Sequence, residues 1–537
     1  MDGAVLCRPF PCVPFTAPSS PRPLPRVPFP GIPVPSIPVP APPMRLLALP
    51  LSLFITSLGP VLAAQHDEAS SWPQFRGPGG HPVSEDSTIP LDFGPERHLL
   101  WRAALPAGHS SPCVHERKVF LTGQVGARGV VVGIDTDTGD ELWRRSFLAE
   151  NPPSYSHADA VPAVSTPCTD GERLFVYVDS YGLVALDLEG QLLWEERMPH
   201  PGYGFGVGTS PILAGGNVIL SRDGAPEAAV FAFDAESGEV AWKIDRFGFI
   251  ESHGTPFLWS NADREELIIG GTSQVCSFDP KTGAPLWNVN GVTVFSCTTP
   301  TANADTLFFG AWSTPNATGR SFWDAGFGRS LELSDEEVAD PNLLFDRLDA
   351  NDNGTVELDE LPECRAKDAF GFLDQNKNGV WERPELITPP GGAESPGANV
   401  LMAIRRGGKG DVTASHVEWT WRRGLPYVAS PLLYRGRIWL MKAGGIVSAI
   451  DAATGKRVLD RERLPDRSEY YMSPMGLAGH VLVGSAEGTL YVLDAEAEGL
   501  EIVHYVDLKD GLFATPAVVD GALFVRTENS LWCFQGE

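Results

Sequence analysis

The chain has 537 residues, and its 41 Lys and Arg against 68 Asp and Glu give a formal net charge of −27. This acidic balance opposes the phosphate neutralisation that binding to nucleic acid or to an anionic membrane surface requires, so we expect neither as a partner. The length allows a large core, and 56 Gly and 48 Pro favour short elements and tight turns over long helices. Eight Cys are too few for a fold built on disulfides.

The first 64 residues predict two segments outside the folded domain. Residues 1–43 contain 15 prolines and almost no charge, which predicts a disordered or untranslated leader. Residues 44–64 begin with Met and Arg, continue as an apolar stretch and end in Ala63-Ala64, the layout of a signal peptide. Two prolines interrupt the stretch, which makes it too short for a membrane-spanning helix. We therefore expect translation to start at Met44 and the mature protein to be exported to the periplasm or the extracellular space.

A hydroxyl residue followed by Pro recurs eight times along the rest of the chain. The pairs are Ser111-Pro112, Thr166-Pro167, Ser210-Pro211, Thr255-Pro256, Thr299-Pro300, Ser430-Pro431, Ser473-Pro474 and Thr515-Pro516. Each pair is followed by short β-rich segments with turn residues between them, and several repeats continue through an Asp-x-x-[Ser/Thr]-Gly turn to a Trp. Four short strands per period of about 44 residues are typical of a propeller blade. The sequence thus predicts a mainly β fold, an eight-bladed β-propeller.

The ends of the repeat predict how the ring closes. The eighth copy ends near Phe534 without a fourth strand, whereas residues 99–102 match the fourth strand of the first copy. We expect the two ends of the chain to share a blade, because this removes exposed sheet edges. Residues 65–98 are then an N-terminal extension, and the propeller comprises residues 99–312 and 399–537.

These repeats resemble the pyrroloquinoline-quinone-like repeat family of bacterial eight-bladed propellers with tryptophan-docking repeats. The opening Trp72-Pro-Gln-Phe-Arg-Gly-Pro78 is similar to the N-terminal signature of secreted members, and the resemblance covers residues 72–312 and 398–535. Quinone dehydrogenases of this superfamily hold their cofactor against an adjacent Cys-Cys disulfide, with a Ca²⁺ and a catalytic Asp nearby. This chain has no adjacent Cys and no Cys-x-x-Cys-His haem motif. The resemblance therefore implies the fold but leaves the activity open, and because these residues are absent we do not expect pyrroloquinoline quinone as a cofactor.

One spacing in the repeat, of 131 residues, predicts an insertion at residues 313–398, within blade five. Residues 349–360 inside it match a twelve-residue EF-hand loop, in which alternate oxygens and a final Glu bind Ca²⁺. The predicted ligands are Asp349, Asn351, Asn353, Thr355 through its carbonyl, Glu357 and Glu360. The surrounding small α-helical module, an EF-hand pair, spans about 334–388.

A second loop of the same pattern occupies residues 374–385. Its predicted ligands are Asp374, Asn376, Asn378, Val380, Glu382 and Glu385. It departs from the family pattern at Trp381, and Pro389-Pro390 truncate the helix that follows. We expect one or two Ca²⁺ ions, with weaker binding in this loop.

Together these features predict an exported, monomeric, calcium-binding propeller that acts as a binding or scaffold module for a protein, peptide, glycan or small ligand. Two alternatives stay open: a divergent pyrroloquinoline-quinone-dependent dehydrogenase, and a scaffold of the outer-membrane-assembly type, although the lipidated Cys of that lipoprotein is lacking. Aromatic and His residues of long inter-blade loops are the candidate ligand contacts: Tyr155, His157, His200, Tyr203, Phe205, Arg246, Phe249 and His253. Cys113 and Cys168 either form a bridge or are buried thiols.

Overall fold

The computed structural model describes residues 71–148, 163–198, 207–223, 228–246, 252–293, 295–313 and 398–536. Within the insertion it describes residues 331, 333–334, 336–337, 341–364, 367, 370, 374, 378–383 and 386. The proline-rich leader and the predicted signal peptide lie outside the described residues. Among the described residues, no α-helix combines the length and the apolar character that crossing a membrane requires.

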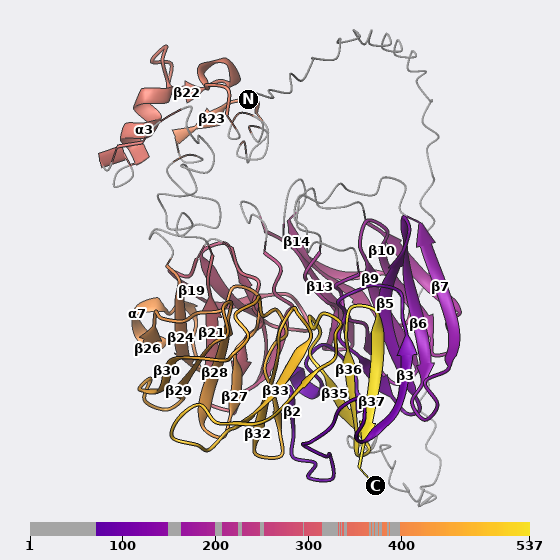
Figure 1. The fold of residues 1–537 in the computed structure, drawn as a ribbon. Helices are drawn as coiled ribbons and strands as arrows, with labels where there is room; N and C mark the ends of the chain where they lie inside the picture. The colour runs from indigo at the N-terminus through magenta and orange to yellow at the C-terminus, as the bar shows by residue number, and fades with distance from the viewer. Residues whose placement is uncertain are drawn as a thin grey trace, which may run out of the picture. The chain divides into compact units, whose positions relative to one another are not determined.

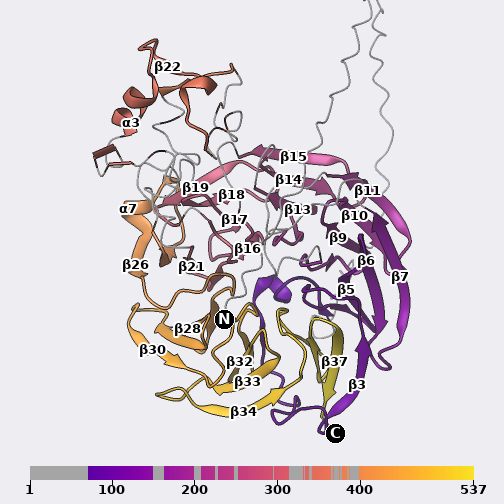
Figure 2. The same ribbon diagram turned by 45° about the horizontal axis from the view of Figure 1, so that its top comes forward.

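Eight antiparallel sheets stand around one axis and form the blades (Figures 1 and 2). Blades one and two contain β4 (Cys113–His115), β5 (Lys118–Val125), β6 (Arg128–Asp135), β7 (Glu141–Leu148), and β8 (Cys168–Thr169), β9 (Arg173–Val178), β10 (Gly182–Asp187), β11 (Leu192–Arg197). Blades three and four contain β12 (Ile212–Ala214), β13 (Asn217–Arg222), β14 (Ala229–Asp234), β15 (Val240–Asp245), and β16 (Phe257–Ser260), β17 (Glu265–Gly271), β18 (Gln274–Phe278), β19 (Pro285–Asn290).

The second half of the ring repeats this arrangement. Blades five and six contain β20 (Thr301–Ala302), β21 (Thr306–Ala311), β24 (Val400–Arg405), β26 (Val417–Trp421), and β27 (Leu432–Tyr434), β28 (Arg437–Lys442), β29 (Ile446–Asp451), β30 (Arg457–Arg463). Blades seven and eight contain β31 (Met475–Leu477), β32 (His480–Gly484), β33 (Thr489–Asp494), β34 (Ile502–Asp507), and β35 (Ala517–Val519), β36 (Ala522–Arg526), β37 (Ser530–Gln535). The predicted eight-bladed propeller is thus confirmed.

The N-terminal part of the described chain closes the ring. Strand β3 (Leu99–Ala104) pairs antiparallel with β37 and completes blade eight. Strand β1 (Ser71–Trp72) pairs with β4 in blade one, and β2 (Val83–Ser84) adds a parallel strand to β31 in blade seven. A short 3-10 turn, η2 (Pro78–Gly80), lies between them. The segment before β3 is therefore bound into two blades.

Hydrophobic side chains pack between neighbouring blades. One cluster joins Phe175 and Tyr177 of blade two to Val218 and Leu220 of blade three, and each of these side chains is buried. Strand alternation explains the pattern, because successive side chains point to opposite faces of a blade and both faces meet another blade. Most of the core therefore lies between the sheets.

The Asp-x-x-[Ser/Thr]-Gly turn brings each tryptophan against the next blade. In blade one, Asp135 Oδ1 accepts the backbone N–H groups of Asp137 and Thr138, at 2.9 and 3.0 Å. Gly139 follows with φ of +76°, and a Cβ there would lie 2.6 Å from the ring of Trp101 in blade eight. The Trp101 indole N–H donates to the carbonyl of Thr136 at 2.8 Å. The same Gly-under-Trp contact recurs for the pairs Gly190–Trp143, Gly238–Trp194, Gly283–Trp242 and Gly455–Trp419.

Blade five is interrupted between its second and third strands, β21 and β24, which pair directly. The insertion contains α3 (Pro341–Leu348), β22 (Thr355–Val356), η3 (Leu358–Glu360) and β23 (Trp381–Glu382). It has its own hydrophobic core, which includes Phe345 and Trp381. After β24, a short strand β25 (Gly410–Asp411) pairs parallel with β19 of blade four, and helix α7 (Thr413–His416) leads into β26.

Candidate functional site

All eight blades contribute residues to the lining of one pocket of about 190 Å³. The pocket therefore lies on the axis of the propeller. We call it the axial pocket. Its lining residues are Phe75, His109, Ser111, Val164, Thr166, Gly208, Ser210, His253, Thr255, Cys297, Thr299, Tyr427, Val428, Ser430, Tyr471, Ser473, Phe513 and Thr515.

Sixteen of these residues form two rings that follow from the sequence repeat. The hydroxyl ring consists of the Ser or Thr before each repeated Pro, one per blade. The second ring, here the variable ring, consists of the residue two positions earlier: His109, Val164, Gly208, His253, Cys297, Val428, Tyr471 and Phe513. Extended backbone places residues two apart on the same side, which explains why both rings face the axis.

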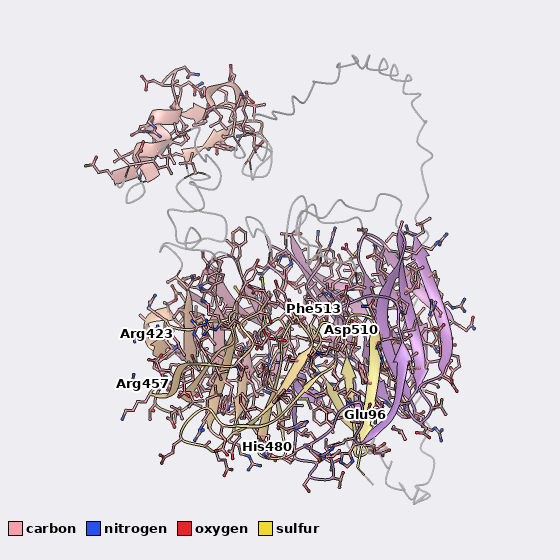
Figure 3. The ribbon with its side chains drawn as sticks, in the orientation of Figure 1. Glu96, Arg423, Arg457, His480, Asp510 and Phe513 are labelled. Atoms are coloured by element: carbon pink, nitrogen blue, oxygen red, sulfur yellow. The ribbon has the colours of Figure 1, made fainter. Side chains whose placement is uncertain are left out.

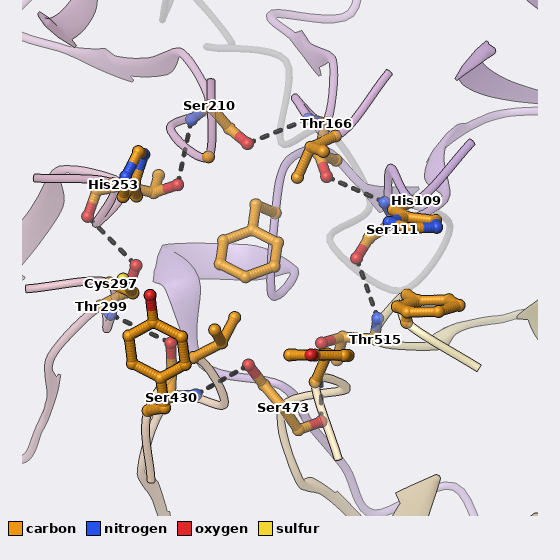
Figure 4. Close-up of a pocket in the computed structure, with 18 residues that line it drawn as sticks. His109, Ser111, Thr166, Ser210, His253, Cys297, Thr299, Ser430, Ser473 and Thr515 are labelled. Carbon is orange, nitrogen blue, oxygen red and sulfur yellow. Dashed lines mark hydrogen bonds between the residues drawn. The ribbon is translucent and has the colours of Figure 1, made fainter. Parts of the chain in front are cut away.

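The hydroxyl ring is closed by hydrogen bonds from blade to blade (Figure 4). Six backbone N–H groups donate to the hydroxyl of the next blade at 2.9 to 3.0 Å: Ser111 to Thr166, Thr166 to Ser210, Ser210 to Thr255, Thr299 to Ser430, Ser430 to Ser473, and Thr515 to Ser111. At the other two junctions the hydroxyl groups of Thr299 and Thr515 donate to the carbonyls of Thr255 and Ser473, at 3.2 and 3.5 Å. These hydrogen bonds explain why each repeat has Ser or Thr before its Pro, because the hydroxyl links neighbouring blades.

The variable ring makes the pocket asymmetric. The rings of His109 and Phe513 stack at a centroid distance of 3.8 Å, and Tyr471 stacks on Phe513 at 5.5 Å. Phe513 and Asp510 lie on one loop (Figure 3), and the Asp510 carboxylate accepts the backbone N–H of Asn529 at 3.0 Å. Blades seven, eight and one thus present a row of three nearly parallel rings to the pocket. The hydrogen bond of Asp510 fixes the loop that carries the middle ring, Phe513.

Two buried arginines lie directly behind the pocket wall. Arg76, next to the lining residue Phe75, donates to the carbonyls of Thr299 and Pro300 at 3.1 and 3.2 Å, and to that of Pro431 at 2.5 Å. Arg526 donates to the carbonyl of Ser110 at 3.1 Å. Burial lowers the pKa of both guanidinium groups to about 9, which leaves both charged at neutral pH.

Sequence reasoning identified only part of this pocket. Of the predicted contact residues, His253 lines the axial pocket. Arg246 is instead buried in an ion pair with Asp223, with Nε to Oδ1 at 2.6 Å. The others, Tyr155, His157, His200, Tyr203, Phe205 and Phe249, lie outside the described residues. The other lining residues Phe75, His109, Cys297, Tyr471 and Phe513 were not predicted. Four of them, all but Phe75, stand two residues before a ring hydroxyl, and this fixed position is the signal that could have revealed them.

The residues present do not fit a quinone held as the family resemblance implies. None of the described lining residues is Asp, Glu, Lys or Arg, so the pocket wall offers neither a catalytic carboxylate nor a cation in contact with a quinone carboxylate. None of the six described cysteines forms a disulfide, and no two Cys are adjacent in the chain. Cys113 and Cys168 are buried thiols, and burial raises the pKa of each. Of the two alternatives for this pair, the structure shows the free thiols.

The first predicted calcium loop is closed by hydrogen bonds to its two end carboxylates. Asp349 accepts the backbone N–H groups of Asn353 and Gly354 at 3.0 and 2.8 Å. Glu360 accepts those of Asn351 and Glu357 at 3.2 and 2.8 Å. Gly354 has φ of +85°, which permits the sharp turn. The chain therefore folds back so that the first and last predicted ligands lie on the same loop interior.

The second predicted loop repeats part of this arrangement. Asp374 accepts the backbone N–H groups of Asn378 and Gly379 at 3.0 and 2.8 Å. The Asn378 amide donates to Glu382 at 3.2 Å, and Val380 precedes β23. The remaining predicted ligands, Asn376 and Glu385, lie outside the described residues.

The two loops are joined by backbone pairing and by packing. Thr355 and Val356 of β22 pair antiparallel with Glu382 and Trp381 of β23. Trp381 is buried, stacks on Phe370 at 4.8 Å and donates its indole N–H to the Phe370 carbonyl at 2.9 Å. Several of the predicted ligand atoms are amide or backbone carbonyl oxygens and so do not belong to His, Cys, Asp or Glu side chains. Among the described residues, no three His, Cys, Asp or Glu side chains converge as a metal-binding group.

Comparison with known proteins supports the resemblance to the quinone-like repeat family. Residues 87–323 match the family model described as outer membrane protein assembly factor BamB. The chain is 27% identical over 127 residues to quinohemoprotein alcohol dehydrogenase ADH IIB of Pseudomonas putida, covering 21% of this chain and 17% of that enzyme's length. It is 22% identical over 390 residues to BamB of Yersinia pestis, covering 72% and 82% of the two chains.

The structural comparison defines the fold class. Quinohemoprotein alcohol dehydrogenase of Comamonas testosteroni superposes with a TM-score of 0.52 at 12% identity, covering 88% of this chain and 81% of that one. The chain is thus an eight-bladed propeller of the quinoprotein-dehydrogenase-like fold. At such low identity the likeness extends to the fold alone.

Proposed function

We propose that this protein is an exported propeller that binds Ca²⁺ in the insertion and acts as a binding or scaffold module through the axial pocket. The observation that carries the Ca²⁺ proposal is the paired loop geometry. In both loops a leading Asp accepts the N–H groups four and five residues later, and β22 and β23 join the loops. Oxygen-rich loops of this length suit Ca²⁺, which takes six to eight oxygen ligands.

The composition of the insertion supports the same proposal. Residues 331–387 contain 16 Asp and Glu against 5 Lys and Arg. Without a cation these charges repel one another, and a bound Ca²⁺ would offset that repulsion. An exported protein meets higher Ca²⁺ concentrations than a cytosolic one, and Asn at the third and fifth loop positions suits the weaker affinities of extracellular modules.

Two observations support a scaffold or binding role over catalysis. The long alignment, over 390 residues, is with a protein named as an outer-membrane assembly factor, whereas the alignment with the dehydrogenase spans 127 residues. The axial pocket also lacks, among its described lining residues, the carboxylate that the resemblance assigns to quinone catalysis. We therefore propose a protein or small-ligand partner for the propeller, and place the protein in the periplasm or outside the cell.

The test uses one variant and a matched control in the same loop. Glu360→Gln removes a predicted ligand charge, and Asp359→Asn removes the same charge from the neighbouring exposed residue, which no predicted ligand position includes. Isothermal titration calorimetry with Ca²⁺ measures binding by the parent protein and by both variants. We expect Glu360→Gln to weaken Ca²⁺ binding at least tenfold, because it removes the charge of a ligand. Asp359→Asn should change the affinity less than threefold, because an exposed charge that is not a ligand is screened by solvent. Equal weakening by both variants would show that only net charge matters and would refute the ligand assignment.

A further inference from the structure

One sector of the outer wall of the propeller is basic, although the chain as a whole is acidic. Residues 422–467 contain 10 Lys and Arg against 4 Asp and Glu, in a chain of net charge −27. Four of these arginines are exposed and lie on the outer strand of blade six, β30, or directly after that of blade five, β26: Arg422, Arg423, Arg457 and Arg461. We call them the arginine cluster. Figure 3 shows Arg423 and Arg457 at one edge of the propeller.

One carboxylate lies among these arginines. Asp460 Oδ1 is 3.1 Å from Arg461 Nε, and Asp460 Oδ2 is 3.4 Å from Arg457 Nη1. Partial burial alone would raise the pKa of Asp460, but hydrogen bonds from Arg461 and Arg457 and the charge of Arg423 lower it. Three guanidinium groups thus act on a single carboxylate, which leaves an excess of positive charge.

A bulge in β30 brings Arg461 to this carboxylate. The register of β29 and β30 shifts there, so that Ser448 faces both Asp460 and Arg461. Adjacent side chains of a regular strand point to opposite faces, whereas a bulge re-aims them. Arg461 has φ of +57°, which is strained for a residue with a Cβ, and its N–H donates to Ser448 Oγ at 3.2 Å. Strained residues of this kind are concentrated at functional sites.

The turn after β26 is fixed beside Arg461. The Trp421 indole N–H donates to the Arg423 carbonyl at 2.5 Å. A Cβ at Gly424 would lie 3.2 Å from Arg461 Cγ. Arginines from two neighbouring blades are therefore held next to each other.

Few carboxylates of the protein compete for the cluster. Apart from Asp460, strands β26 and β30 contain only Glu418 and Glu462. Glu418 Oε1 lies 3.8 Å from Arg405 Nε, and Glu462 accepts a backbone N–H of blade seven at 3.0 Å. Arg422 has no ion pair with any residue that the structure describes. Guanidinium groups of the cluster are therefore available to a ligand from outside.

We propose that the arginine cluster binds an acidic peptide segment of a protein partner, whose carboxylates pair with its exposed guanidinium groups. The arginine fork matches a carboxylate, and Asp460 already makes this kind of contact. A membrane surface or a nucleic-acid duplex extends beyond the cluster and meets the acidic remainder of the chain, so a short peptide fits better. The cluster lies outside the axial pocket and the insertion, so the proposal goes beyond the proposed function and is tested separately.

The experiment measures fluorescence anisotropy of labelled hexaglutamate and of the neutral control hexaglutamine, titrated with the purified full chain. Ca²⁺ is left out, because it would itself bind the acidic peptide. We expect hexaglutamate to bind at least tenfold more tightly than hexaglutamine, and its affinity to fall as salt rises from about 50 to about 300 mM, since exposed charges are screened. Equal affinity for the two peptides, or no hexaglutamate binding at millimolar concentration in low salt, would overturn the proposal. Displacement of the peptide by phosphatidylglycerol vesicles at equal anion concentration would assign the cluster to a membrane surface and overturn the peptide partner.

Variants locate the surface. Arg457→Gln combined with Arg461→Gln should weaken hexaglutamate binding about tenfold, and Arg422→Gln alone about threefold. Arg422 has no ion pair to lose, which preserves a test if the double variant does not fold. The matched control is Arg144→Gln, which removes one charge from the outer strand of blade one, where Arg144 pairs with Glu141 at 2.5 Å, and should leave the affinity unchanged. Equal weakening by Arg422→Gln and Arg144→Gln would mean a response to net charge alone and would contradict the proposal.

Discussion

The contact between a turn glycine and the tryptophan of the neighbouring blade predicts a specific loss of stability. Gly190 has φ of +80°, and a Cβ at this position would lie 2.6 Å from the ring of Trp143. The Trp143 indole N–H donates to the Leu188 carbonyl at 2.9 Å in the same turn, so the ring has little room to move. Gly190→Ala therefore combines a strained backbone with an overpacked contact between blades one and two.

The magnitude follows from these two terms. A left-handed backbone costs an L-residue about 1–2 kcal/mol, and overpacking costs about 1–3 kcal/mol more. We expect Gly190→Ala to lower the free energy of unfolding by about 2–5 kcal/mol. Gly216 is the matched control, because its φ is +86° and no atom lies within 4 Å of an added Cβ. Gly216→Ala should therefore lose only the backbone term, about 1–2 kcal/mol.

The assay is urea unfolding of both variants and the parent protein, followed by circular dichroism. The difference between the two variants isolates the interblade contact, because the backbone term is common to both. A difference near zero would refute the reasoning, since it would mean that the Trp143 ring yields without cost. A larger loss for Gly216→Ala would refute it as well.

Two further predictions concern charges. The Asp223 and Arg246 side chains are 1% and 2% exposed, so Asp223→Asn leaves the Arg246 guanidinium buried without its carboxylate. We expect this variant to lower the free energy of unfolding by about 3–5 kcal/mol in the same urea titration. Replacing Asp223 by Leu and Arg246 by Met together should recover most of this loss, and an equal loss in the double variant would contradict the account. Hydrogen bonds from the Ser237 backbone and side chain lower the pKa of Asp234, so its stabilising effect is complete above the unfolded value of 3.8 and is lost as pH falls through the lower folded value. The melting temperature of the parent should therefore exceed that of Asp234→Ala at pH 7 and approach it below pH 3.8. A difference in melting temperature that grows as the pH falls would contradict the lowered pKa of Asp234.

The periodic part of the fold could be predicted because blade strands repeat with fixed spacing. The pairs from Ser111-Pro112 to Thr515-Pro516 mark the inner strands, and the missing fourth strand after Phe534 indicated ring closure through β3. These predictions depend only on local chain direction and turn chemistry. Blade number, strand order and the shared eighth blade are accordingly observed as predicted.

The axial pocket could be predicted only in part. The hydroxyl ring was visible as a repeat, but its partner ring varies in side-chain type, from Gly208 to Phe513, so no composition signal marks it. The predicted contacts lay in the long inter-blade loops instead, because those loops contain aromatic residues. The position of Arg76 could not be predicted, because residues 71–98 have no periodicity and Arg76 binds carbonyls more than 220 residues away in the chain.

The central claim is tested most directly by isothermal titration calorimetry of the EDTA-treated protein, first with Ca²⁺ and then with pyrroloquinoline quinone in the Ca²⁺-loaded sample. The account predicts saturable binding of one or two Ca²⁺ ions and no saturable binding of the quinone. Saturable quinone binding would contradict the binding-module account. Absence of Ca²⁺ binding, established by heat and by direct metal analysis of the dialysed protein, would contradict the assignment of the insertion.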